Sequence, residues 1–249
     1  MSSTSSGQNG TIAVPVKTAP AITSWTPGAS HFDPQGRLIF REPEHRYFLD
    51  VEDAAHELIS VTTAIKEGLK GVCGEEFWTE QSRLRGAAVH KAILYHAQGD
   101  LDADTLHPVV APYFDGYLQF LAEERPTILY VEQLVFDEAY KYGGTFDLLV
   151  VLHGFHEATP MANVTVLDLI DVKSGAIPWW CDLQVCAYRR RVTLIYPRAA
   201  IRPWCLQLKN NGTFHLEPLA PTAREIRTSE HDFLSVLRTA QLQRRHARS

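Results

Sequence analysis

Two aspartates and a lysine near the middle of the chain have the residue types and spacing for metal-dependent chemistry. Asp171 and Lys173 end an apolar segment that also contains Leu167 and Leu169, and on a strand these four side chains would share one face. A solvated, salt-bridged strand end would also explain that pair. Asp147, in a second apolar segment, favours a shared site, because an isolated buried carboxylate is costly.

Glu132 adds a third carboxylate to this set. It is expected to share a strand face with Tyr130, Leu134 and Phe136. Three carboxylates on successive strands make a site for a hard cation, with oxygen ligands that suit Mg²⁺ or Mn²⁺. Such an ion polarises a phosphoryl oxygen and generates hydroxide, while a lysine ammonium orients the attacking water or stabilises developing charge. The residues therefore predict phosphoryl-transfer chemistry.

Three β-rich segments must position these side chains. They are expected at residues 128–136, 142–152 and 164–173. The polar loop 153–163 would let the second and third pair as neighbours, which brings Asp147 and Asp171 to one edge of the sheet. Gly143 and Gly144 indicate a bulge or a close backbone approach.

The other expected elements surround this centre. A hairpin is predicted over residues 37–40 and 46–50 around Glu42-Pro43-Glu44, and a second over 201–208 and 213–219 around Asn210-Asn211-Gly212. Helices are predicted after Ser60 through Leu69 and over residues 75–97, 109–124, 182–196 and 222–243. This order predicts the α/β class, a mixed central β-sheet flanked by helices. Residues 1–24 are expected to be a flexible tail and 25–249 a single domain.

Five short motifs follow one another in the chain. They are Gly86-Ala87-Ala88-Val89-His90, the strand residue Glu132, Gly144-Thr145-Phe146-Asp147, Asp171-Val172-Lys173 and Gln184-Val185-Cys186-Ala187-Tyr188. In this order the chain, from His45 to about Tyr188, resembles the RecB-like branch of the PD-(D/E)XK nucleases. His45-Arg46-Tyr47 and Ser60-Val61-Thr62 resemble the N-terminal segment of its phage-type and mitochondrial-type exonucleases.

The resemblance implies a restriction-endonuclease-like core and a role for each motif. It adds His90 and Val172 to the metal ligands Glu132, Asp147 and Asp171. It also implies that Gln184 and Tyr188 position the lysine-bearing strand or the DNA backbone. The implied catalytic residues are Glu132, Asp147, Asp171, Lys173, Gln184 and Tyr188. From the residues alone, a histidine such as His90 is more often a core residue than a ligand, and Gln184 and Tyr188 could equally be a helix face packed on the sheet.

Substrate contacts are expected beside this centre. Arg83 and Arg85, on the His90 helix, and Arg189, after Tyr188, could follow a phosphate track, although a solvated helix face would also explain Arg189. Trp179 and Trp180 could stack on unpaired bases, or simply pack a loop.

Composition narrows the function classes. A net charge of -5 over 249 residues counts against a protein that coats DNA, but less against a nuclease with an acidic metal site. The four cysteines include no CxxC pair, which favours reduced thiols in a cytoplasmic protein. They also lack the tight spacing with which some RecB-like relatives hold an iron–sulfur cluster, so the resemblance implies no cluster here. No apolar run is long enough to span a membrane. Since no nucleotide-binding loop motif occurs, any helicase or recombination partner would be another chain.

The leading hypothesis is a DNA exonuclease acting in recombination, repair or phage DNA processing. The alternatives are a structure-specific or restriction-type endonuclease with the same core, and a catalytically silent nucleic-acid-binding protein of the same fold.

Overall fold

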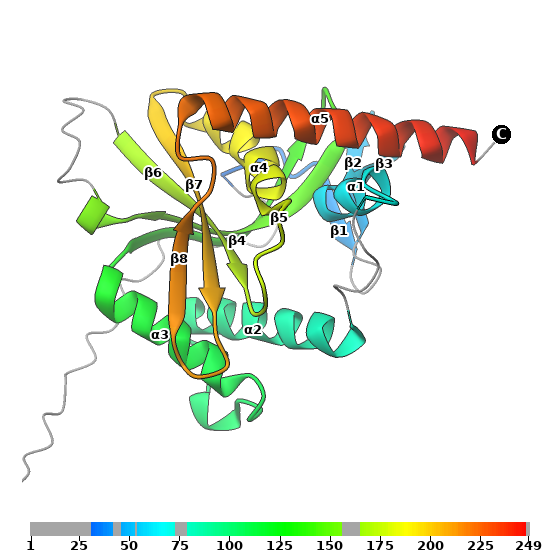
Figure 1. The fold of residues 1–249 in the computed structure, drawn as a ribbon. Helices are drawn as coiled ribbons and strands as arrows, with labels where there is room; N and C mark the ends of the chain where they lie inside the picture. The colour runs from blue at the N-terminus through cyan, green and yellow to red at the C-terminus, as the bar shows by residue number, and fades with distance from the viewer. Residues whose placement is uncertain (1–30, 42–45, 53, 73–78, 156–164, 248–249) are drawn as a thin grey trace, which may run out of the picture.

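The computed structural model describes residues 31–41, 46–52, 54–72, 79–155 and 165–247, which form a sheet covered by helices on both faces (Figure 1). The eight strands of this part are β1 (Leu38–Arg41), β2 (Arg46–Val51), β3 (Ala54–Ser60), β4 (Thr127–Asp137), β5 (Tyr142–Val151), β6 (Thr165–Lys173), β7 (Ala199–Leu208) and β8 (Phe214–Pro218). The helices are α1 (Val61–Gly68), α2 (Glu80–Gln98), α3 (Ala111–Glu124), α4 (Cys181–Ile195) and α5 (Ala223–His246), with short 3-10 turns at Ala103–Thr105 and His153–Phe155.

The sheet is mixed. Its order is β1-β2-β3-β5-β6-β7-β8, and β4 pairs with β5. The β3–β5 and β6–β7 pairs are parallel and the other pairs are antiparallel. The predicted α/β class with a mixed, helix-flanked sheet is therefore confirmed, as is the pairing of the Asp147 and Asp171 strands, which runs from Leu148↔Ile170 to Val150↔Asp168.

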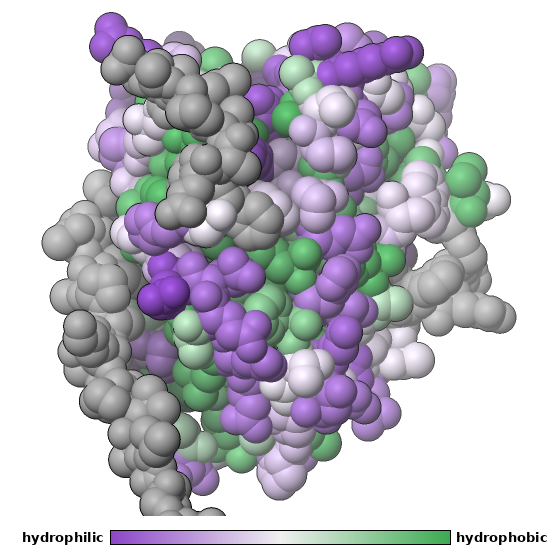
Figure 2. Space-filling view, turned by 60° about the vertical axis from the view of Figure 1, so that its left-hand side comes forward, coloured by the Kyte–Doolittle hydropathy of each residue, from purple (hydrophilic) through white to green (hydrophobic). Residues whose placement is uncertain are grey.

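Two apolar cores lie on opposite faces of the sheet. The α4-side core joins α1, α4 and α5 to the sheet through residues such as Ile65, Val185 and Phe233. The α2-side core joins α2 and α3 to the other face through residues such as Ile93 and Phe120. Figure 1 shows α5 lying across α1 and α4 on one side, with α2 and α3 on the other. The face of the molecule that Figure 2 shows carries a mixture of polar and apolar side chains.

Local sequence explains where the longer helices begin and end. The Thr79 side chain caps the first turn of α2, and Gly99 ends this helix at a left-handed φ of 79°. A capping box of Thr222 and Glu225 begins α5. No helix in the described residues combines the length and apolar character that crossing a bilayer requires.

Strand β3 was not predicted. Its first four residues are exposed and the last three buried, so the segment Ala54–Ser60 lacks the alternation that marks a half-buried strand. Antiparallel pairing with β2 holds it in the sheet instead. The predicted turn Glu42-Pro43-Glu44, the tail 1–24 and most of the loop 153–163 lie outside the described residues.

Strand β5 has a divided edge. It pairs with β4 along almost its whole length on one side. On the other side, in the described part, β3 meets it only at Tyr142 and Gly143, and β6 only from Leu148 to Val150. Residues 144–147 therefore face the opening between β3 and β6, and Asp147 stands at the border of that opening.

Candidate metal centre

A cavity of about 710 Å³ occupies the opening beside β5. Its walls come from the β3–α1 junction, α2, β4, β5, the end of β6 and α4. The sequence-predicted residues that line it are Arg83, Arg85, His90, Glu132, Asp147, Val172, Lys173, Gln184 and Tyr188. The fold thus gathers nearly all of the predicted catalytic and metal-binding residues around one hollow, although they come from five separate elements.

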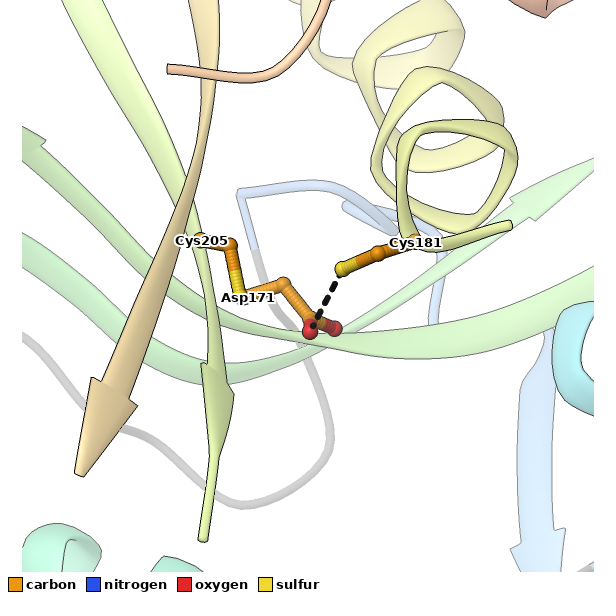
Figure 3. A group of neighbouring side chains, drawn as sticks. All are labelled: Asp171, Cys181 and Cys205. Carbon is orange, nitrogen blue, oxygen red and sulfur yellow. Dashed lines mark hydrogen bonds between the residues drawn. The ribbon is translucent and has the colours of Figure 1, made fainter. Parts of the chain in front are cut away.

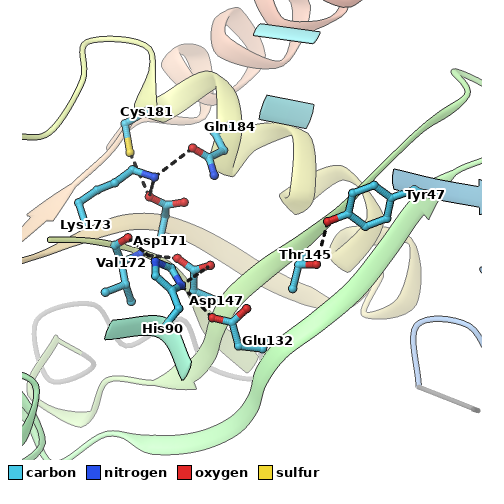
Figure 4. Close-up of polar contacts among 10 residues, drawn as sticks. All are labelled: Tyr47, His90, Glu132, Thr145, Asp147, Asp171, Val172, Lys173, Cys181 and Gln184. Atoms are coloured by element: carbon cyan, nitrogen blue, oxygen red, sulfur yellow. Dashed lines mark hydrogen bonds and ion pairs between the residues drawn. The ribbon is translucent and has the colours of Figure 1, made fainter. Parts of the chain in front are cut away.

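His90 is at the centre of the first group of donors (Figure 4). Its Nδ1 lies 2.8 Å from Glu132 Oε1 and 3.5 Å from Asp147 Oδ1, and its Nε2 lies 3.2 Å from the Val172 carbonyl oxygen. One ligand atom from each of His90, Glu132 and Asp147 lies within 4.8 Å of the others. Two carboxylates, an imidazole and a backbone carbonyl form a donor set that fits a divalent cation such as Mg²⁺ or Mn²⁺.

The electrostatics of this group also fit a cation. Burial, together with the charges of Asp171 and Glu132, raises the pKa of Asp147 to about 7, against the opposing charges of His90 and Lys173. Burial would lower the pKa of His90, but Asp147 and Glu132 outweigh it and raise this pKa to about 10. Near neutral pH the group therefore holds protons in the place where a metal ion would supply positive charge.

The backbone is irregular where Glu132 and Asp147 face each other. Glu132 lies opposite Asp147 in the β4–β5 register and has a φ of 48°, which is uncommon and strained for a residue other than glycine. On β5, Phe146 packs in the α4-side core and Leu148 in the α2-side core, so the strand changes face between them. This irregularity turns Glu132 toward α2. The expectation that Glu132 shares the face of Tyr130 was wrong, because Tyr130 packs against the α4-side core.

Asp171 and Lys173 form a second group at the end of β6. Lys173 Nζ lies 2.6 Å from Asp171 Oδ2, and Asp171 is only 3% exposed. Both side chains lie on the same side of β6 as α4, the side on which Leu167 and Leu169 are buried, as predicted. Burial would lower the pKa of Lys173, but Asp171 and its other acidic neighbours raise it, so the ammonium stays charged. The Val172 N–H donates to Asp147 Oδ2 at 2.6 Å and ties the two groups together.

Helix α4 holds the lysine in place. Lys173 Nζ donates to Gln184 Oε1 at 3.1 Å. One turn further along, Tyr188 lies against β5 so closely that a Cβ added at Gly144 would be 2.6 Å from its Cε1 atom. The close backbone approach predicted from Gly143 and Gly144 is therefore present at Gly144. Both Gln184 and Tyr188 are buried, and burial raises the pKa of the Tyr188 hydroxyl well above its usual value.

The predicted substrate contacts divide into two sets. Arg83 and Arg85 line the cavity; the exposed Arg83 pairs with Glu80, and Arg85 lies over the Tyr113 ring. The other three do not line it. Trp180 is buried in the α4-side core, and Trp179, 63% exposed, lines a separate cavity beside α5.

Arg189 joins α4 to its neighbours. Its guanidinium contacts Glu230 on α5 at 2.6 Å and donates to the Ile201 carbonyl at 2.9 Å. These bonds fix the Arg189 side chain between α4 and its neighbours, away from the cavity. The prediction that Arg189 follows a phosphate track in the cavity is therefore corrected: its role is structural.

Two contacts near the centre were not predicted. The Tyr47 hydroxyl lies 3.0 Å from Thr145 Oγ1 at the cavity wall, and Cys181 Sγ lies 3.5 Å from Asp171 Oδ2. Both join residues far apart in the chain. Only the first had a sequence signal, since His45-Arg46-Tyr47 belongs to the segment that resembles exonucleases.

No protein-family model matches this chain, and no curated protein matches it. Its function is therefore inferred from the residues of the centre.

Proposed function

We propose that this protein is a Mg²⁺- or Mn²⁺-dependent nuclease that hydrolyses phosphodiester bonds in DNA. The observation that carries the proposal is the convergence of His90, Glu132, Asp147 and the Val172 carbonyl on one cavity, beside the charged Lys173. Burying these ionisable side chains at a sheet edge without a bound cation would cost free energy, because buried charges need partners. Ionisable groups with strongly shifted pKa values that gather in one cavity are typical of functional sites.

The residues present fit the implied metal. His90, Glu132, Asp147, Asp171 and the Val172 carbonyl would hold it. The bound cation would polarise a phosphoryl oxygen and lower the pKa of a coordinated water. The chain itself supplies positioning and charge.

Lys173 is the residue best placed to act on the substrate. Asp171 and Gln184 hold its ammonium at the cavity wall, where it would orient the attacking water and offset negative charge on the phosphate. Gln184 and Tyr188 act through Lys173 as positioning residues, since a fixed ammonium loses little freedom during the reaction.

The proposed core is that of the RecB-like PD-(D/E)XK nucleases. Support comes from the meeting of four separate motifs at one place, namely those ending in His90, Asp147, Lys173 and Tyr188. The choice of DNA, and of an exonuclease in recombination, repair or phage DNA processing, follows from this resemblance. Arg83 and Arg85 at the cavity wall suit a phosphate backbone. A helicase or recombination protein would be a separate partner.

The test compares end-labelled linear DNA with closed circular DNA, each incubated with Mg²⁺ or with EDTA. The proposal expects metal-dependent degradation of the linear DNA alone. Cleavage of circles would replace the exonuclease with the endonuclease alternative. Asp171→Ala should abolish cleavage, whereas Glu123→Gln, an exposed carboxylate on α3, should leave it unchanged. If the wild type shows no metal-dependent cleavage and Asp171→Ala behaves like it, the nuclease proposal is overturned, and the result favours a nucleic-acid-binding protein.

A further inference from the structure

Asp171 belongs to a second group of metal-ligating side chains, on the α4 side of β6 (Figure 3). Cys181 is the first residue of α4, and Cys205 is the β7 residue that pairs with Asp171 in the sheet. One carboxylate oxygen and the two Sγ atoms all lie within 4.8 Å of one another. The three residues are buried, at 3%, 1% and 0% exposure. The proposed nuclease chemistry uses neither thiol.

The donor set differs from that of the candidate metal centre. Two thiols and a carboxylate favour thiophilic divalent ions such as Zn²⁺ and Cd²⁺ over Mg²⁺. Zn–S bonds of about 2.3 Å space tetrahedral sulfur ligands about 3.8 Å apart. Cys181 Sγ and Asp171 Oδ2 are already 3.5 Å apart, so small side-chain rotations complete the spacing.

Charge and access also fit a cation. When a divalent ion binds, the two thiols release their protons; the resulting two thiolates and the carboxylate carry three negative charges, which the ion and the ammonium of Lys173, 2.6 Å from Asp171, together balance. Cys181 lines a cavity of about 560 Å³ between α4, α5 and the end of β8. The described lining of that cavity carries one guanidinium, that of Arg224, against four carboxylates, those of Asp182, Glu217, Glu225 and Asp232, so its negative balance attracts an approaching cation.

We propose that Asp171, Cys181 and Cys205 form a binding site for a thiophilic divalent cation, Zn²⁺ or Cd²⁺, whose occupancy engages Asp171 and inhibits the enzyme. The binding site stands on its own donors, whereas the inhibition rests on the proposed nuclease function. Inhibition follows because Asp171 cannot hold Lys173 and serve the candidate metal centre in its present position while also ligating the second ion.

The binding test is a titration of the full chain with Cd²⁺, followed by the ultraviolet absorption of thiolate-to-metal charge transfer. The wild type should saturate at one Cd²⁺ per chain, and Zn²⁺ should displace it. Cys181→Ser and Cys205→Ser should each lose the signal, with Cys205→Ala as the substitute if the serine variant does not fold. The matched control is Cys186→Ser, which changes a buried cysteine of α4 outside the group and should keep the signal.

The inhibition test adds Cd²⁺ to Mg²⁺-driven DNA hydrolysis. Cys205→Ser should hydrolyse DNA like the wild type but need about tenfold or more Cd²⁺ for the same inhibition. Equal inhibition of both would overturn the regulatory role. A wild type without the charge-transfer signal, or a signal that survives both Cys181→Ser and Cys205→Ser, would overturn the site. Nuclease activity without the charge-transfer signal would overturn this cation site but not the proposed function. The signal without nuclease activity would overturn the proposed function but not the cation site.

Discussion

Metal binding at the candidate centre should release protons. The pKa of His90 is raised to about 10 and that of Asp147 to about 7, and a metal ligand must be deprotonated. At pH 7 His90 holds nearly one proton and Asp147 about half of one, so binding should release about 1.5 protons. Because protons compete with the ion, affinity rises with pH, by about 30-fold between pH 6.5 and 7.5. The rise should level off above the pKa of His90.

Calorimetric titration with Mn²⁺ measures this release. Repeating the titration at pH 7 in two buffers of different ionisation enthalpy gives the number of protons from the difference in observed heat. His90→Gln removes the histidine proton, and release should fall to one proton or less. His215→Gln is the matched control, since this half-exposed histidine on β8 lies outside the cavity. Release of less than half a proton by the wild type, or equal release by His90→Gln, would refute the linkage.

Three substitutions separate positioning, chemistry and folding. Gly144→Ala should displace Tyr188, lower the free energy of unfolding by about 1–3 kcal/mol in urea and slow DNA hydrolysis, and an unchanged rate would contradict the role of Tyr188. Lys173→Met should slow hydrolysis about 10²–10³-fold without weakening Mn²⁺ binding in calorimetry, and weaker binding would make Lys173 a structural residue instead. Asp168→Ala should cost about 3–5 kcal/mol of stability in urea, because Arg202 loses a buried partner at 2.7 Å, yet the rate per folded molecule should hold.

The strands that carry the centre could be predicted because their composition is local information. Long apolar runs place β5 and β6, and alternation puts Asp171 and Lys173 on one face. The polar sequence of residues 153–163 marks a connection between them that lets the two strands pair as neighbours. Strand β3 could not be found in this way, because its exposed first half reads as loop and only pairing with β2 makes it a strand.

The details of the centre depend on contacts that no local pattern encodes. Glu132 faces His90 only because its backbone takes a positive φ opposite Asp147. Cys181 and Cys205 meet Asp171 because α4 begins beside the parallel β6–β7 pair. The sequence around Trp180 is compatible with stacking on bases and with burial in the core. The tertiary packing, which places Trp180 in the α4-side core, decides between the two.

The most direct test of the nuclease proposal is the rate of DNA hydrolysis by the purified chain at saturating Mg²⁺, beside Asp147→Asn. With enzyme in excess over an end-labelled linear duplex, the wild type should degrade the DNA and stop when EDTA is added. Asp147→Asn, confirmed as folded by circular dichroism, should be slower by about 10³-fold or more, because the centre loses one of its proposed metal ligands. A wild-type rate that is the same in Mg²⁺ and EDTA, or an Asp147→Asn rate equal to that of the wild type, would contradict the proposal.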